Sequence, residues 1–207
     1  MKLAIVVGHN SASQGAVRQD TGESEFVWNG RLARRIERLA TTYDLDVRVF
    51  HRTPGGGYRA EIRRVYDEVD AWRADASIEL HFNSAASPEA TGTETLTSGT
   101  ALSLRLAESV QREMVVALGL RDRGIRTRAA QERGGGSLYA GRAPAILIEP
   151  FFGSSTRGQS ATDEDSEQER LADAILRGTA EAFQSFPRTD LSGSRTIRAA
   201  ETQRQAQ

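Results

Sequence analysis

The first eighty residues alternate between short apolar runs and amphipathic segments. Residues 3–7 form the run LAIVV, which Gly8 ends, and residues 45–50 form the run LDVRVF. Short runs rich in β-branched residues and bounded by breakers are typical of buried strands. Between the two runs, apolar residues recur with helical spacing over about residues 28–43. The pattern therefore predicts a strand, a helix and a second strand in succession.

The same order continues along the chain. The segment YRAEIRRVYDEVDAWR predicts a helix and leads directly into the expected strand ASIELHF, residues 76–82. The other expected elements are strands at 93–98 and 145–149, helices over about 107–118 and 166–186, and an Arg- and Gly-rich loop at 121–136. Ser166 and Glu169 have the spacing of a capping box at the start of the last helix. Strands that alternate with helices predict an α/β fold: three layers, with a mostly parallel twisted sheet flanked by helices.

The chain has 207 residues, which suits one catalytic domain over residues 1–187 and a tail over residues 188–207. The tail is polar and has few large apolar residues, so we expect it to be disordered. The first apolar run is too short for a secretory signal, and no segment approaches the length of a membrane span. We therefore expect synthesis in the cytoplasm without a signal peptide, and no membrane anchor.

Composition narrows the chemistry. The 27 Lys and Arg against 28 Asp and Glu give a net charge of -1, which argues against nucleic acid as a partner. Cysteine is absent, which excludes disulfides, thiol nucleophiles and Cys-based zinc sites. A metal ion would have to be held by histidine and carboxylate side chains.

Polar residues interrupt the expected strand in SIELHFNSA, residues 77–85. Glu79, His81 and Asn83 are two residues apart, so in a strand their side chains point to the same face. Buried ionisable groups must be hydrogen-bonded, paired or coordinated to an ion. His9 likewise follows the first strand at its carboxyl end, the edge at which α/β sheets place ligands.

A hydrolytic zinc site needs three protein ligands and one open position, commonly with two His and one carboxylate. His9, Glu25 and His81 meet that requirement, and Glu149 at the end of the strand at 145–149 is the candidate general base. His51 could replace one of the two histidines, but we interpret it as structural.

Several segments, in this order, resemble the zinc-dependent N-acetylmuramoyl-L-alanine amidases of the Amidase_3 type. They are GHN at 8–10, ESEFVWNGRLARRI at 23–36, VRVFHR at 47–52, ADASIELHFNSA at 74–85, GTETL at 92–96, DRGIR at 122–126 and PAILIEPFFGS at 144–154. The resemblance extends over nearly all of residues 3–187. It implies a phosphorylase/hydrolase-like α/β fold and hydrolysis of the amide between N-acetylmuramic acid and L-alanine of the stem peptide.

Position by position, the resemblance assigns the Zn²⁺ ligands to His9, Glu25 and His81, and the catalytic glutamate to Glu149. Glu25 is preferred to Glu23 because the family's ligand stands four residues before an Asn, and Glu23 is the alternative. Three positions depart from the family pattern: Asn10 replaces a Gly, Glu79 replaces a small polar residue, and Ser154 or Ser155 replaces an Asn.

Glu79 has two interpretations, which the sequence leaves open. It is either a buried carboxylate paired with an arginine or a carboxylate that contacts a zinc-bound histidine and orients its ring. We interpret Arg121, Arg123, Arg126 and Arg128 as a solvated face rather than as a binding site for stem-peptide carboxylates. The glycines at 134–136 are expected to form a flexible loop and not a phosphate-binding loop.

The expected function is hydrolysis of peptidoglycan during cell lysis, as by a phage endolysin. The enzyme would reach the wall after a holin-type partner opens the membrane, and its substrate would be peptidoglycan or muropeptides. The alternatives are an effector delivered by a secretion apparatus, a zinc peptidase that cuts within the stem peptide, and a non-catalytic wall-binding protein of the same fold. The sequence assigns no substrate-binding residue.

Overall fold

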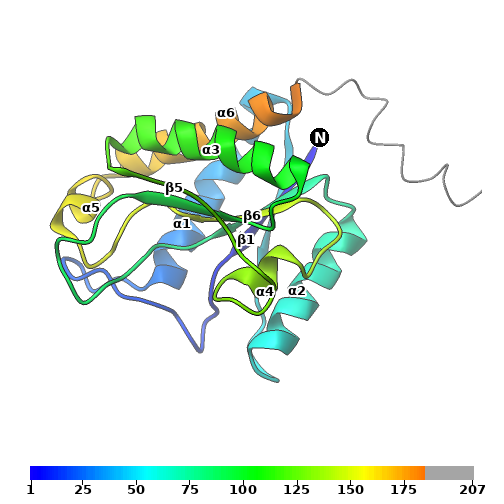
Figure 1. The fold of residues 1–207 in the computed structure, drawn as a ribbon, viewed down its shortest axis with the longest axis horizontal. Coiled ribbons are helices and arrows are strands. Elements are labelled where there is room, and N and C mark those ends of the chain that lie inside the picture. Colours follow the sequence, from blue (N-terminus) through cyan, green and yellow to red (C-terminus); the bar gives the residue numbers. More distant parts are fainter. Residues whose placement is uncertain (185–207) are drawn as a thin grey trace, which may run out of the picture.

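The computed structural model describes residues 1–184, which form a six-stranded sheet between two layers of helices (Figure 1). The strands are β1 (Lys2–Val7), β2 (Asp46–His51), β3 (Ala76–Leu80), β4 (Thr93–Thr97), β5 (Asp122–Thr127) and β6 (Ala145–Glu149). The helices are α1 (Glu25–Leu39), α2 (Tyr58–Trp72), α3 (Ala101–Leu118), α4 (Gly135–Leu138), α5 (Thr156–Ser160) and α6 (Asp165–Gln184), and a 3₁₀ turn (Ala40–Tyr43) follows α1. No helix in this described range is long and apolar enough to cross a membrane.

The strand order is β2-β1-β3-β6-β4-β5. Neighbouring strands are parallel except for β4 and β6, which pair antiparallel. The mostly parallel, three-layer α/β fold expected from the sequence is confirmed. Strand β6 is the last strand in the sequence, but it lies inside the sheet, between β3 and β4.

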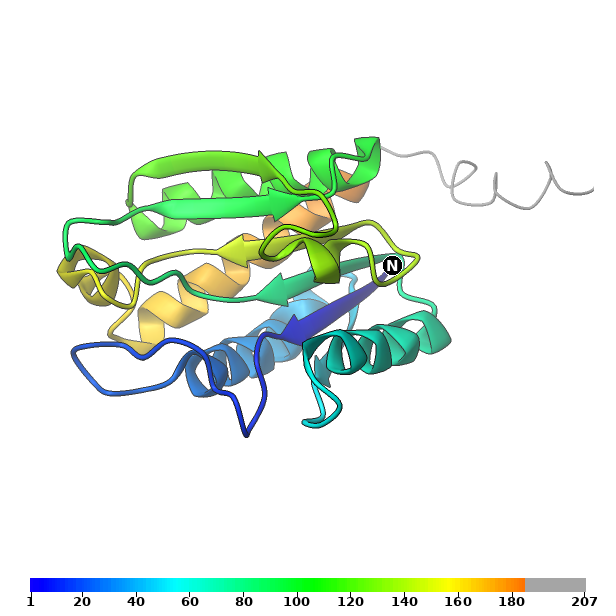
Figure 2. The same ribbon diagram turned by 60° about the horizontal axis from the view of Figure 1, so that its bottom comes forward.

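The helices divide between the two faces of the sheet (Figures 1 and 2). Helices α1, α3 and α6 cover one face and enclose the larger core, in which Trp28 packs edge-on against Phe82 and Phe151. Helices α2 and α4 lie on the other face. There the apolar contacts form two separate clusters, one between α2 and strands β1 and β2, and one between α4 and strands β4 and β6. Between these clusters runs β3, the strand that carries Glu79.

Backbone pairing aligns the carboxyl ends of the three central parallel strands. Beyond β1, the Gly8 amide donates to the Leu80 carbonyl at 3.0 Å, and beyond β3, the His81 amide donates to the Ile148 carbonyl at 3.1 Å. Residues that follow β1 and β3 therefore lie beside the end of β6. This alignment brings residues far apart in the sequence to one edge of the sheet.

Some sequence-based boundaries are wrong. The segment 121–136 is not a loop, because it contains β5 and the short helix α4. An edge strand with partly exposed side chains lacks the apolar alternation of a buried strand, so its sequence resembles a loop. Strand β3 ends at Leu80, and beyond it Asn83 forms only an isolated bridge with Phe152.

The start of the last helix also differs from the prediction. Helix α6 begins at Asp165, so Ser166 is its second residue and the Ser166–Glu169 capping box does not form. Instead Glu167 accepts from the backbone amides of Asp163 and Glu164, at 3.0 and 3.3 Å. The predicted tail at 188–207 and the end of the predicted domain at residue 187 lie outside the described residues.

Candidate metal centre and catalytic carboxylate

His9 occupies an unusual backbone conformation at the end of β1. Its φ of 66° lies in the left-handed region, which residues other than glycine adopt uncommonly. The Nε of Arg52 donates to the His9 carbonyl at 3.1 Å and holds the turn from one side. Strained backbone of this kind is concentrated at functional sites. The turn directs the imidazole back across the sheet edge.

Glu25 is the first residue of α1 rather than part of the preceding loop. Ser24 caps the helix, and its hydroxyl accepts from the Val27 amide. The Glu25 carboxylate accepts from the amides of Ala16 (3.1 Å) and Phe82 (3.2 Å), and the positive end of the helix dipole favours its charge. It is therefore a buried, fixed carboxylate with 3% of its surface exposed.

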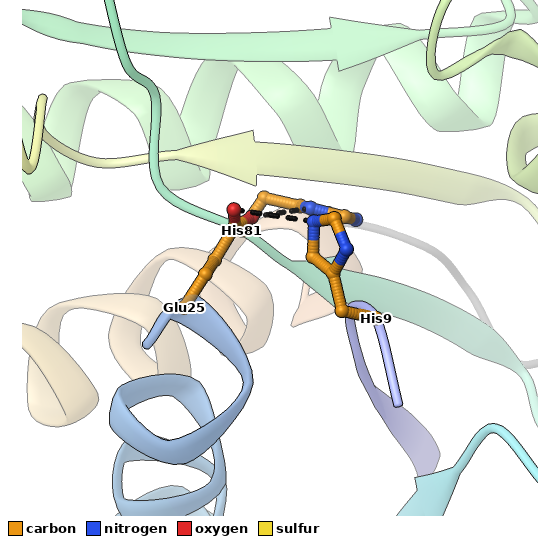
Figure 3. A group of neighbouring side chains, drawn as sticks. All are labelled: His9, Glu25 and His81. Carbon is orange, nitrogen blue, oxygen red and sulfur yellow. Dashed lines mark hydrogen bonds and ion pairs between the residues drawn. The ribbon is translucent and has the colours of Figure 1, made fainter. Parts of the chain in front are cut away.

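His81 follows β3 directly and completes the group (Figure 3). Its Nδ1 lies 2.6 Å from Glu25 Oε1, while His9 Nε2 lies 3.1 Å from Glu25 Oε2. The donor atoms of the three residues all lie within 4.8 Å of one another. Two imidazole nitrogens and a carboxylate that converge in this way form the donor set of a catalytic zinc site. No other group of three such side chains occurs within the described part of the chain.

Two glycines leave room for this group. A Cβ on Gly15, whose φ is +80°, would lie 2.6 Å from His9 Nε2 and 2.7 Å from Glu25 Oε2. A Cβ on Gly8 would lie 2.6 Å from the His81 ring and 2.4 Å from the Leu80 carbonyl oxygen. The His9 and His81 rings can occupy these positions only because residues 15 and 8 lack a side chain. Donor set and space together fit a small metal cation.

The charges of the group are strongly coupled. Burial alone would raise the pKa of Glu25, but hydrogen bonds from His81 and His9 outweigh it and hold this pKa far below its usual range. Burial alone would lower the pKa of His81, but its hydrogen bonds to Glu25 and Glu79 raise that pKa to about 10. Without an ion, a proton on His81 therefore satisfies the two carboxylates. Binding a cation there requires release of that proton.

Glu149 ends β6 beside this group. Its Oε2 is buried and has no hydrogen-bond partner among the described residues. Burial raises the pKa of Glu149 to about 7; His81 lowers this pKa, and the negative charge of Glu25 adds to the increase. A carboxylate with a pKa near neutrality can both accept and return a proton at physiological pH.

The other candidates lie apart from the donor group. Glu23 forms an ion pair with Arg31 at 2.7 Å and is not one of the three converging residues. His51 ends β2, where its ring contacts Phe26 edge-on, and burial lowers its pKa. The side-chain oxygen of Asn83 accepts from the next backbone amide, that of Ser84. Among the described residues, Glu25 and not Glu23 therefore joins the two histidines, and His51 lies outside this group.

The structure also identifies residues near the site that the sequence did not single out. These residues are Arg52, which donates to the His9 carbonyl, and Gly15, where an added Cβ would overlap the His9 ring. The contact of Asn10 was also not foreseen: this departure from the family pattern donates from its side chain to Glu61 Oε2 on α2 at 2.8 Å. Long-range contacts of this kind leave no signal in the sequence, because each residue type is common in loops.

The expected solvated arginine face is only partly correct. The Nε atoms of Arg123 and Arg126 lie 3.4 and 3.6 Å from Glu94 Oε2, so these two arginines flank a buried carboxylate. Arg123 also lies over the ring of Phe152, 4.9 Å from its centroid. The glycines at 134–136 belong to the turn and the short helix α4 rather than to a flexible loop.

Comparison with known proteins identifies one family over most of the chain. The family model described as N-acetylmuramoyl-L-alanine amidase (Amidase_3) matches residues 3–181. The N-acetylmuramoyl-L-alanine amidase LytC of Bacillus subtilis (strain 168) is 28% identical over 181 residues, which cover 86% of this chain and 34% of LytC. The chain therefore spans about a third of the length of this curated relative.

Solved structures show the same fold. The catalytic domain of CwlV, an N-acetylmuramoyl-L-alanine amidase from Bacillus (Paenibacillus) polymyxa var. colistinus, superposes with a TM-score of 0.74 at 23% identity, covering 90% of this chain and 100% of CwlV. The catalytic domain of the CD27L endolysin, which targets Clostridia difficile, gives a TM-score of 0.74 at 22% identity, covering 87% of this chain and 97% of that domain.

Proposed function

The chain belongs to the N-acetylmuramoyl-L-alanine amidase family (Amidase_3), and we propose that it is a zinc-dependent hydrolase of peptidoglycan. The bond cleaved is the amide between N-acetylmuramic acid and the L-alanine of the stem peptide. The observation that carries the proposal is the convergence of His9, Glu25 and His81 at the sheet edge where Glu149 ends β6.

His9, Glu25 and His81 would hold the zinc ion. When bound, the ion supplies Lewis acidity, which polarises a carbonyl and lowers the pKa of water. Glu149 then acts as the general base: its carboxylate takes the proton of the attacking water and returns it to the leaving nitrogen of L-alanine. Its pKa near 7 suits both proton transfers. Glu25, fixed by two backbone amides, keeps its carboxylate in place during the reaction.

The test is digestion of purified peptidoglycan with and without a chelator, followed by mass spectrometry of the products. Release of free stem peptides that begin with L-alanine, abolished by the chelator and restored by zinc, is the expected result. Cuts within the stem peptide would instead support a zinc peptidase. Intact sacculi at every zinc concentration would overturn the enzymatic proposal and favour wall binding without catalysis.

We further propose that the enzyme acts in cell lysis as an endolysin. The likeness to the CD27L endolysin domain supports this role, with peptidoglycan as substrate and a holin-type protein as the partner that gives access to it. The catalytic domain would comprise residues 1–187. Expression in the cytoplasm of a bacterial host should leave cells intact until a membrane-permeabilising agent is added, and should then cause rapid lysis. Lysis at the same rate in cells that express Glu149→Gln would contradict the role.

A further inference from the structure

Glu79 is a buried carboxylate that contacts a candidate metal ligand on the side away from the site. Only 1% of its surface is exposed. Its Oε1 lies 2.9 Å from His81 Nε2, and its Oε2 accepts from the Tyr66 hydroxyl at 3.0 Å. The nearest guanidinium nitrogen, Arg52 NH2, is 3.9 Å away. The closest partners of Glu79 are therefore a histidine and a tyrosine, and the arginine is secondary.

A carboxylate at the location of Glu79 is unfavourable unless it accepts hydrogen bonds. Glu79 lies on the central strand β3, on the sheet face covered by α2 and α4, between two apolar clusters. A buried ionised carboxylate there needs hydrogen-bond donors to offset its lost hydration. Tyr66 on α2 and the His81 ring each supply a donor. An apolar residue would fill the same space without that requirement.

The hydrogen bond restricts the chemistry of His81. An ionised carboxylate only accepts hydrogen bonds, so the nitrogen that faces Glu79 must carry a proton. In a neutral imidazole with its proton on Nε2, the lone pair lies on Nδ1. His81 Nδ1 is the atom that faces Glu25, at 2.6 Å. The contact with Glu79 thus selects the tautomer and ring orientation that a metal ligand at this position requires.

We propose that Glu79 is a positioning residue that fixes His81 as an Nδ1 ligand of the metal ion. The inference rests on the proposed metal site. It decides between the two interpretations that the sequence left open, because the carboxylate bonds to the ligand itself more closely than to any arginine.

Arg52 connects this arrangement to the second histidine. Its Nε donates to the His9 carbonyl, and another nitrogen of the same guanidinium lies beside Glu79. Arg52 is itself buried, with 5% exposed. One side chain therefore braces the His9 turn and the carboxylate behind His81. The His81 ring is thus held at the nitrogen that does not face Glu25, and the His9 turn is held at its backbone carbonyl.

The test compares zinc affinity in three variants by competition with a chromogenic chelator. Glu79→Ala removes the acceptor, and we expect the dissociation constant for zinc to rise 10- to 100-fold. Glu79→Gln keeps an acceptor oxygen for His81 Nε2–H, and we expect less than a tenfold change. Glu94→Gln is the matched control, because it removes a buried carboxylate that does not contact a ligand. Its affinity should stay within threefold of the parent.

Nuclear magnetic resonance of the zinc-loaded protein gives a readout that does not depend on activity. The His81 Nε2 proton should resonate at low field and exchange slowly in the parent and in Glu79→Gln, and this signal should be lost in Glu79→Ala. If Glu79→Ala does not fold, Tyr66→Phe removes only the hydroxyl that orients Glu79, and a two- to tenfold weaker zinc affinity is expected.

The outcomes separate this inference from the proposed function. Parental zinc affinity in a folded Glu79→Ala variant, or an equal loss in Glu94→Gln, would overturn the positioning role. Zinc binding without release of stem peptides would overturn the proposed activity and leave the role of Glu79 standing. Failure of the parent to bind zinc would overturn both.

Discussion

Glu94 and Glu149 lie directly opposite one another in the antiparallel pairing of β4 and β6. Side chains at opposed positions share one face of the sheet, with Cβ atoms about 4.5–5.5 Å apart. Burial is the main cause of the raised pKa of Glu149, and the charge of Glu94 adds to it. The Nε atoms of Arg123 and Arg126 lie 3.4 and 3.6 Å from Glu94 Oε2. The pKa of about 7 allows Glu149 to carry a proton near neutral pH.

The pH dependence of the reaction follows from this pairing. Glu149 must be ionised to act as a base, so kcat/KM should rise about tenfold per pH unit at low pH and level off above the pKa of Glu149. Its pKa of about 7 in the protein without an ion is an upper bound, since a bound cation lowers it. Initial rates on soluble muropeptides between pH 4.5 and pH 9 measure the position of this limb.

Glu94→Gln serves as the control for that assignment. Removing the opposed negative charge should move the limb to lower pH while leaving the plateau rate within a few-fold. An unchanged limb in this variant would show that Glu94 does not contribute to the pKa of Glu149. A limb that moves upward would contradict the assignment of Glu149 as the base.

Glu149→Gln should abolish turnover without loss of the metal. The amide has nearly the same shape but cannot accept the proton of water, so kcat should fall by about 10²–10⁴-fold. Zinc content by atomic absorption should remain one equivalent, because Glu149 is not one of the three converging donors. Loss of zinc from this variant would show instead that Glu149 is a ligand.

The same substitution should stabilise the metal-free protein at alkaline pH. A carboxyl whose pKa is raised from 4.5 to about 7 on folding contributes stability that is complete below pH 4.5 and is lost as the pH rises through 7. Glu149→Gln stays neutral, so at pH 8 it should raise the free energy of unfolding by about 3 kcal/mol, or Tm by about 6–12 °C. At pH 4 the two proteins should have the same Tm. Equal melting at both pH values would contradict the buried, unpartnered carboxylate.

Gly15→Ala should weaken metal binding through steric overlap alone. The added methyl group would lie between His9 Nε2 and Glu25 Oε2, so we expect at least a tenfold higher dissociation constant for zinc. Gly22→Ala is the matched control: its φ of +73° imposes similar backbone strain, but a Cβ there meets no atom within 4 Å. Isothermal titration of both variants separates the two effects. Equal losses would assign the effect to backbone strain.

The positions of His9, His81 and Glu149 at strand ends could be predicted from the sequence, because each of these strands is a clear apolar run. His9, His81 and Glu149 all come directly at or after such runs, and parallel strands place their carboxyl ends at one edge. The preference for Glu25 over Glu23 needed the family resemblance, since nothing in the local sequence distinguishes the two. The structure separates them by the first turn of α1, which points only Glu25 inward.

Other features depend on contacts that no local pattern encodes. The sequence of β5 resembled a loop because it has no apolar alternation. This strand forms through its pairing with β4. Strand β4 runs antiparallel to its neighbour β6, which follows about fifty residues later in the sequence. The sequence near β4 therefore could not predict its direction in the sheet. The partners of Glu79 come from α2 and from the end of β2, so the sequence could state the alternatives but not decide between them.

The position of β6 in the sheet also orders events during synthesis. The proposed ligand set is complete once residue 81 has left the ribosome, but the proposed base, Glu149, arrives with a strand that must insert between two strands already made. A nascent chain lacking β6 therefore has metal-binding side chains without a proton acceptor. In the proposed endolysin role, this topology would delay hydrolytic competence until the sheet is closed.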